Sequence, residues 1–339
     1  MIFANSKKYY YIMINISKCY VLKIQTFIKK CNLVYQHLEK VIYKKELINY
    51  NDINTFNVSS KCKNDSNNNK REIVICSIIN NKIPDNYYKY SFRWRKLKNE
   101  TYKYIDKLCK DNNIIIQKQK CIIKAGRNNY YDFKIIINDT REFNVELKFN
   151  AECIKEIPQF ISPMKPSKYL EYSYEEYYYD NYIKKLSNEY GLILPCRKEY
   201  IKKIHSNSPL CVNEYQKKYY KGCIKSSKYT AVKEDIEFYE ESKKKSKDSI
   251  ISFINLYSIN IKMLSEYLLE TQKNKYYMFY KNNNIYFETV NQDNYIITSY
   301  IKEPDRQRYL ATTKSGNILK ILLRWKNGNG IAFPAFQIS

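Results

Sequence analysis

The stretch YYDFKIIINDTREFNVELKFNA, residues 130 to 151, decides the fold of this chain. The turn-forming residues NDTR at 138–141 separate two apolar runs, and this pattern predicts a β-hairpin. A turn centred on Asp139 places residue 132 opposite residue 146, and a centre half a residue later places it opposite residue 147. In both registers Asp132 and Glu146 lie on neighbouring strands, with Cβ atoms roughly 5 Å apart.

Side-chain alternation sorts the second strand into two faces. Glu146 and Lys148 share one face with two asparagines, and we expect Val145, Leu147 and Phe149 to pack on the core. Two adjacent carboxylates repel each other unless a cation lies between them, and Mg²⁺ is commonly held by one or two carboxylates with a substrate phosphate. We therefore expect Asp132, Glu146 and the Leu147 carbonyl to bind a metal. Lys148 would then orient a water or stabilise charge on a phosphate.

The order of an acid, a hairpin and Glu-x-Lys resembles the signature of the PD-(D/E)XK nuclease superfamily, here Asp132 followed by Glu146-Leu147-Lys148. This resemblance covers about residues 90 to 190. FNAECIKEIPQFISPMKPSKYLEYSYEEYYYDNY (149–182) and ILLRWKNGNGIAFPAFQIS (321–339) are similar to restriction-endonuclease-like proteins of large DNA viruses. The resemblance implies a Mg²⁺-dependent phosphodiesterase, with Mn²⁺ as a substitute, that acts on double-stranded DNA. It also implies a restriction-endonuclease-like central mixed sheet flanked by helices.

Further site residues follow from the same resemblance. The family often places an acid on the helix before the sheet, and Glu100 is the candidate, with Asp106 as a competitor. Gln159 matches a glutamine found after the lysine strand in several branches, whereas Tyr131 stands where the family often has proline. Because a lysine-rich chain produces Asp-x13-Glu-x-Lys by chance, the alternative is a surface hairpin with a cross-strand Glu–Lys pair.

The charge of the chain indicates a polyanionic partner. Its 339 residues contain 59 Lys and Arg against 34 Asp and Glu, a net charge of +25, and nucleic acid is the commonest partner of so basic a protein. The alternative is codon bias, because an AT-rich genome raises Lys, Asn, Ile and Tyr together. Codon bias does not explain why acids failed to rise with lysine.

The order of patterns predicts a mixed α and β fold in three parts. Residues 1–70 form an N-terminal extension, with helical spacing at 25–47 and a polar linker at 51–70. Residues 71–200 form the nuclease-like core, with a strand at 71–79, an amphipathic helix at 90–113, the hairpin, and a helix that stops at Gly191. Residues 201–339 hold a long helix at 243–274, where KKKSK marks the start, and a β-rich end.

The C-terminal part is a candidate DNA-contacting region. KNGNG at 326–330 predicts a hairpin, and basic residues surround it: Arg306, Arg308, Lys314, Lys320, Arg324 and Lys326. We expect Arg308, Lys314, Arg324 and Lys326 to contact phosphates, and the alternative is a β-subdomain with a solvated basic rim. For the Tyr-rich segment 172–182 we favour core packing over base stacking.

The remaining features bear on the compartment and the partners. Ten scattered cysteines without a C-x-x-C pair and only two histidines predict free thiols in a reducing compartment. The chain has no run of 18 apolar residues and no signal-peptide pattern, so we expect a soluble, intracellular protein without a membrane partner, in which Met13 is an alternative start. A nuclease of this kind that cuts both strands is usually a homodimer. Two other hypotheses stay open: a non-catalytic nucleic-acid-binding protein, and a structural viral protein packaged beside nucleic acid.

Overall fold

Two five-stranded sheets organise the part of the chain that the computed structural model describes. The described residues are 21–26, 36–43, 46–57, 64–124, 129–156, 159–160, 165–205, 217–218, 222–225, 228–229, 232–325 and 334–339. They confirm the mixed α and β class. The chain divides into a first unit, Met1–Ile154 with Lys275–Glu288, and a second unit, Lys155–Asn274 with Thr289–Ser339. The division falls after Ile154 instead of near residue 200, and the 275–288 segment returns to the first unit.

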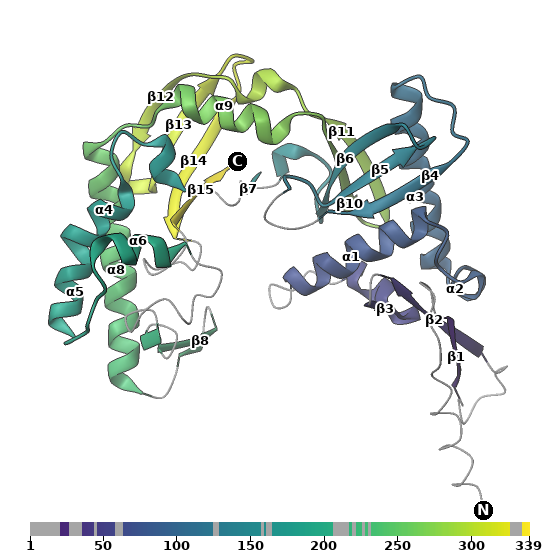
Figure 1. Cartoon of the computed structure of the whole chain (residues 1–339), viewed down its shortest axis with the longest axis horizontal. Helices are drawn as coiled ribbons and strands as arrows, with labels where there is room; N and C mark the ends of the chain where they lie inside the picture. Colours follow the sequence, from purple (N-terminus) through teal and green to yellow (C-terminus); the bar gives the residue numbers. More distant parts are fainter. Residues whose placement is uncertain are drawn as a thin grey trace, which may run out of the picture. The chain divides into compact units, whose positions relative to one another are not determined.

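The first unit is built on a mixed sheet in the order β11-β10-β6-β5-β4 (Figure 1). Its strands are β4 (Gln119–Ile123), β5 (Phe133–Ile137), β6 (Arg141–Phe149), β10 (Lys275–Lys281) and β11 (Asn284–Thr289). Strands β4, β5 and β6 are antiparallel neighbours, whereas β10 runs parallel to β6. Parallel neighbours need a long crossover, and here the chain passes through the second unit between them.

The predicted hairpin is confirmed with the turn centred on residue 139. Phe133 pairs with Val145 and Ile137 with Arg141, so position 132 faces position 146. Asn138 and Asp139 adopt φ values of 53° and 60°, a conformation that Asn and Asp tolerate better than most residues. The turn chemistry therefore fixes the register.

Helices cover the sheet of the first unit. They are α1 (Asn64–Ile79), α2 (Asp85–Tyr90) and α3 (Phe92–Asp111), preceded by a 3-10 helix at Tyr50–Asn57. Ser91 caps α3 by accepting a hydrogen bond from the Trp94 N–H. The amphipathic pattern of this helix is confirmed, since Trp94, Leu97, Tyr104 and Leu108 are buried in the core with the inward-facing residues of the strands.

Three local predictions for the first 80 residues are wrong. Residues 71–79 form the second half of α1, not a strand, because a short apolar run buried all around does not show which period it follows. Much of the predicted linker 51–70 is helical. The buried Arg71 guanidinium holds this segment in place by donating two hydrogen bonds to the Thr55 carbonyl, at 2.6 and 2.9 Å. The predicted helix at 25–47 is replaced by an antiparallel sheet of β1 (Val21–Thr26), β2 (Gln36–Tyr43) and β3 (Glu46–Ile48), because strand pairing outweighs weak helical spacing.

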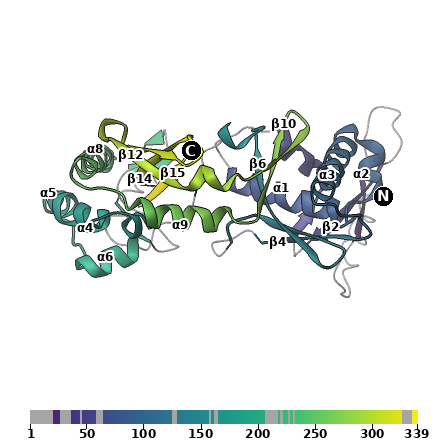
Figure 2. The same cartoon turned by 90° about the horizontal axis from the view of Figure 1, so that it is seen from above.

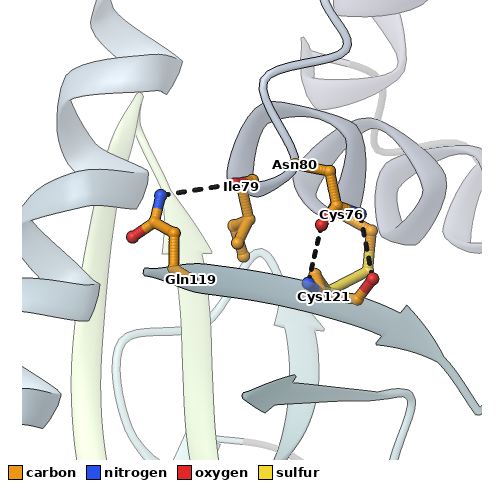
Figure 3. Close-up of a disulfide and its surroundings, with 5 residues drawn as sticks. All are labelled: Cys76, Ile79, Asn80, Gln119 and Cys121. Carbon is orange, nitrogen blue, oxygen red and sulfur yellow. Dashed lines mark hydrogen bonds between the residues drawn. A yellow bond between two sulfur atoms is a disulfide. The ribbon is translucent and has the colours of Figure 1, made fainter. Parts of the chain in front are cut away.

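The expectation of free thiols is wrong for one pair. Cys76 of α1 and Cys121 of β4 form a disulfide with Cα atoms 5.2 Å apart (Figure 3), because the helix packs on the edge strand at that point. Asn80 reinforces the same junction, since its amide accepts from the Cys121 N–H at 2.8 Å and donates to the Cys121 carbonyl at 2.9 Å. The edge strand thus gains the partners that a further strand would supply. Among the described cysteines, Cys109, Cys153 and Cys196 are free.

The second unit contains an antiparallel sheet in the order β12-β13-β14-β15-β7. Its strands are β12 (Ile297–Glu303), β13 (Arg308–Thr313), β14 (Ile318–Trp325), β15 (Pro334–Ile338) and β7 (Gln159–Phe160), with a separate pair of β8 (Cys223–Lys225) and β9 (Lys228–Tyr229). Its helices include α4 (Tyr174–Tyr178), α5 (Lys184–Glu189), α6 (Arg197–Ile204), α8 (Lys233–Leu256) and α9 (Ile261–Gln272). The predicted hairpin at KNGNG lies outside the described residues.

The long helix predicted at 243–274 is two helices. Helix α8 ends at Leu256, and α9 begins after Asn260, whose side chain accepts from the Met263 N–H as an N-cap. Figure 2 shows α8 end-on and α9 lengthwise, so the two run in different directions. The lysine run 243–247 lies in the middle of α8 and not at a helix start, because α8 begins ten residues earlier than the apolar stripe suggests.

The tyrosine-rich segment 172–182 is confirmed as core packing. Tyr174, Tyr177, Tyr178 and Tyr179 are buried on the helical stretch that leads through a π-turn into α5. The predicted stop at Gly191 is also confirmed, because this residue has φ +60° just after α5 ends.

Candidate active site

Asp132 and Glu146 meet at one end of the β5–β6 hairpin. The Asp132 N–H donates to the Val145 carbonyl at 3.0 Å, and the Asp132 carboxylate accepts from the Leu147 N–H at 2.8 Å. The hairpin therefore fixes both the backbone and the side chain of the first acid.

Two lysines hold the second acid. Lys148 forms an ion pair with Oε1 of Glu146, and Lys275 places its Nζ 2.6 Å from Oε2. Lys275 comes from β10, where Tyr277 pairs with Glu146, so both residues lie on the same face of the sheet. Its side chain is only 5% exposed. The resemblance to the nuclease superfamily predicted no role for this second lysine.

Glu72 of α1 is the acid that the sequence reasoning missed. It is 7% exposed and interacts electrostatically with Asp132, Lys148 and Glu146. The resemblance predicts an acid on a helix before the sheet. Because the apolar run at 71–79 reads as a strand in the sequence, it does not point to Glu72. Recognition of α1 as a helix would have found it.

The cluster shifts the pKa of each carboxyl group in it. Burial and the charge of Asp132 raise the pKa of Glu72 to about 8, and burial together with the charge of Glu146 raises the pKa of Asp132 to about 6. Burial also acts to raise the pKa of Glu146, but Lys148 and Lys275 outweigh it and lower this pKa to about 2. Burial acts to lower the pKa of Lys148, and the carboxylates of Glu146 and Asp132 raise it on balance. Lys148 is therefore a protonated ammonium group.

The donor set fits a divalent cation with oxygen ligands. The N–H and C=O of one strand residue point to the same side, so the Leu147 carbonyl faces the side on which Asp132 lies. With the carboxylates of Asp132 and Glu146 it offers three oxygens, the kind of ligand that Mg²⁺ prefers. In the described ranges no three His, Cys, Asp or Glu side chains form a metal-binding group, so any cation here would rest on two carboxylates and a carbonyl.

The other acids expected at the site have partners outside the cluster or are exposed, and the expected glutamine belongs to the second unit. Glu100 pairs with Lys96 at 3.2 Å and Lys103 at 2.9 Å and accepts from the Ile285 N–H at 3.4 Å. Burial acts to raise the pKa of Glu100, but these partners lower it, so this acid belongs to a local ion-pair network. Asp106 is exposed on α3. Gln159 belongs to β7 of the second unit and pairs with Ile338 of β15.

The basic residues expected at the nucleic acid have partners within the second unit. Arg308 pairs with Glu303 at 2.5 Å, Lys314 pairs with Asp293 at 3.2 Å, and Arg324 donates to the Gln337 side chain at 2.6 Å. Burial lowers the pKa of Arg324. Lys326 lies outside the described residues. Phosphate contacts by these residues stay a prediction, and each of these internal partners occupies only part of the N–H donors of its basic group.

Comparisons with protein-family models, with curated proteins and with solved structures found no match to this chain. None of the helices among the described residues combines the length and apolar character that a membrane span requires.

Proposed function

We propose that the first unit is a metal-dependent endonuclease that hydrolyses phosphodiester bonds of DNA, with a restriction-endonuclease-like core. The observation that carries this proposal is the meeting of Asp132, Glu146 and Lys148 at one end of a hairpin, with Glu72 beside them. The mixed sheet flanked by helices agrees with the resemblance of the sequence to the PD-(D/E)XK superfamily.

Each side chain has a role that its surroundings support. Asp132, Glu146 and the Leu147 carbonyl would hold Mg²⁺ or Mn²⁺, which supplies a Lewis acid and lowers the pKa of a bound water. The raised pKa of Lys148 keeps it charged, so it is suited to stabilising negative charge on a phosphate and not to removing a proton. Glu72, with a pKa of about 8, is suited to carrying a proton near neutral pH.

The net charge of +25 supports DNA as the substrate, since a strongly basic protein gains affinity for a phosphate backbone by releasing counterions. Binding should then weaken steeply as the salt concentration rises. A homodimer would let two such sites cut both strands of a duplex.

The test is a cleavage assay on plasmid, linear and branched DNA with Mg²⁺, Mn²⁺ or EDTA. The wild type should cut with either metal and not with EDTA, while Asp132→Ala and Lys148→Ala should not cut. Glu100→Gln, a change to a buried acid of the same unit that lies outside the cluster, should cut normally. Intact DNA under every condition would refute the proposal.

One observation favours a second function, that of a non-catalytic nucleic-acid-binding protein. Both carboxylate oxygens of Glu146 already have an ammonium partner, so the cluster could be a self-contained ion-pair network that needs no metal. In that case the protein would bind DNA without cutting it, and Asp132→Ala would leave the binding unchanged.

A further inference from the structure

Glu146 uses both of its oxygens on lysines. Lys148 pairs with Oε1 and Lys275 lies 2.6 Å from Oε2, and water has little access to the ammonium group of Lys275. A divalent cation that takes Glu146 as a ligand would bring a third positively charged group against the same carboxylate. The repulsion among these three positive charges on one carboxylate favours the departure of one of the two lysines.

We propose that Lys275 is a placeholder cation, which occupies Oε2 of Glu146 in the metal-free protein and leaves it when a divalent cation binds. This inference rests on the proposed function, because it assumes that the cluster is a metal site. The placeholder keeps the cluster near electrical balance, because the ammonium groups of Lys148 and Lys275 match the carboxylates of Glu146 and Asp132.

The positions of the two lysines decide which one leaves. Lys148 projects from the same strand as Glu146, two residues along it, and stays beside the cluster whichever oxygen it contacts. Lys275 is the first residue of β10, directly after a turn in which Asn274 adopts φ 52°. It also has a second place to rest its charge, because its Nζ lies 5.7 Å from the centroid of the Tyr277 ring on the same face of β10.

The exchange would couple the metal to the substrate. The arrival of a divalent cation in a nearly balanced cluster leaves an excess of positive charge, and a phosphate of the DNA backbone is suited to neutralise it. The protein without DNA should therefore bind the metal weakly, and DNA should tighten that binding by the same factor by which the metal tightens DNA binding.

The experiment measures Mn²⁺ binding to the full chain without DNA, with free Mn²⁺ counted by electron paramagnetic resonance. Lys275→Met removes the competing charge and should bind Mn²⁺ at least about tenfold more tightly than the wild type, a change of ~1.4 kcal/mol. Lys275→Arg keeps the charge and should bind as weakly as the wild type. Lys281→Met alters a lysine of the same strand that pairs with Glu152, and should change nothing.

A second measurement uses the wild type alone, in case Lys275→Met does not fold. Lysine acylation followed by mass spectrometry should show that Mn²⁺ increases the reactivity of Lys275, because the amine leaves its carboxylate partner. Unchanged reactivity would overturn the placeholder role.

The outcomes separate the two proposals. Equal Mn²⁺ affinity of the wild type and Lys275→Met, with binding lost in Asp132→Ala, would refute only the role of Lys275. No Mn²⁺ binding by any of the proteins, Lys275→Met included, would refute the metal site and the proposed nuclease with it.

Discussion

The charged cluster on the sheet of the first unit contrasts with the hydrogen-bonded side chains around Trp325 in the second unit. On the first sheet, Glu146 lies between two lysines with Asp132 and Glu72 close by, so charged groups share a space with little water. Beside the second sheet, the Trp325 N–H donates to the Tyr174 hydroxyl at 2.8 Å, and that hydroxyl lies 2.9 Å from the Ser249 hydroxyl. Neutral hydrogen bonds join these three side chains, while the same unit buries the Glu175 carboxylate beside His205.

The two kinds of buried polar group are expected to contribute differently, one to folding stability and the other to chemistry. Neutral buried hydrogen bonds stabilise a fold modestly, whereas replacing buried ion pairs with apolar side chains is often neutral or stabilising. The helices and strands of the first unit share an apolar core that is separate from the charged cluster. A cluster that raises the pKa of two carboxyl groups costs folding free energy, and this cost is expected of a site kept for catalysis.

The largest expected effect compares two lysines that are matched in exposure, one from each unit. The side chains of Lys148 and Lys245 are 24% and 21% exposed, and Lys245 joins Glu189 and Glu241 in the second unit. Lys148→Ala should lower the rate of metal-dependent DNA cleavage by about 10²–10³-fold, the usual effect of removing one group that stabilises a transition state. Lys245→Ala should leave the rate within about twofold, because this lysine stabilises only local structure. If both variants lose the same fraction of the cleavage rate in single-turnover assays, the lysine of the cluster is no more important for cleavage than the lysine of the second unit.

The second prediction concerns the pH dependence of folding stability. Glu72 has a pKa of about 8 in the folded protein against an ordinary 4.5, so between these pH values the folded state binds more protons than the unfolded state. Stability therefore falls as the pH rises through this window. Glu72→Gln removes this dependence and should be more stable than the wild type at pH 8.5, by up to about 5 kcal/mol, but not at pH 4. Urea unfolding at both pH values measures the difference.

Glu100→Gln is the control of opposite sign for this measurement. The lysines around Glu100 lower its pKa, so its ionised form stabilises the fold, and its removal should reduce stability near neutral pH. A loss of stability at pH 8.5 in both variants would mean that Glu72 is a structural acid like Glu100.

Local chemistry explains why some of this could be predicted from sequence. The hairpin register follows from turn residues beside alternating strands, so the position of Asp132 opposite Glu146 could be predicted, and α3 follows from apolar spacing with a serine cap. Glu72 was missed because the apolar run that follows it has no readable period. Lys275 lies 129 residues from Glu146 in the sequence, and no local pattern shows that β10 returns beside β6.

The third prediction tests the neutral core of the second unit. Tyr174→Phe removes the acceptor of the buried Trp325 N–H. Because a buried donor is then unsatisfied, the free energy of unfolding, measured with urea, should fall by about 1–3 kcal/mol. DNA cleavage by the folded variant should be unchanged, since Tyr174 is buried and lies outside the proposed catalytic cluster. Tyr172→Phe, at a side chain that is 38% exposed, should change neither quantity. A loss of cleavage by folded Tyr174→Phe would show that the neutral core also serves the reaction.

The smallest expected effect lies in the backbone of the second unit. Gly191 ends a helix with φ +60°, and a Cβ added there would meet no atom within 4 Å, so only the backbone conformation opposes a side chain. Gly191→Ala should therefore cost about 1 kcal/mol in urea unfolding, the strain of an L-residue in the left-handed region. Gly191→Asn should cost less, because the chain itself uses asparagine at positive φ in several turns, including Asn81, Asn138 and Asn274. Equal losses of unfolding free energy for alanine and asparagine would show that the backbone conformation does not cause the loss. Packing around this turn would then be tighter than the open space beside Gly191 suggests.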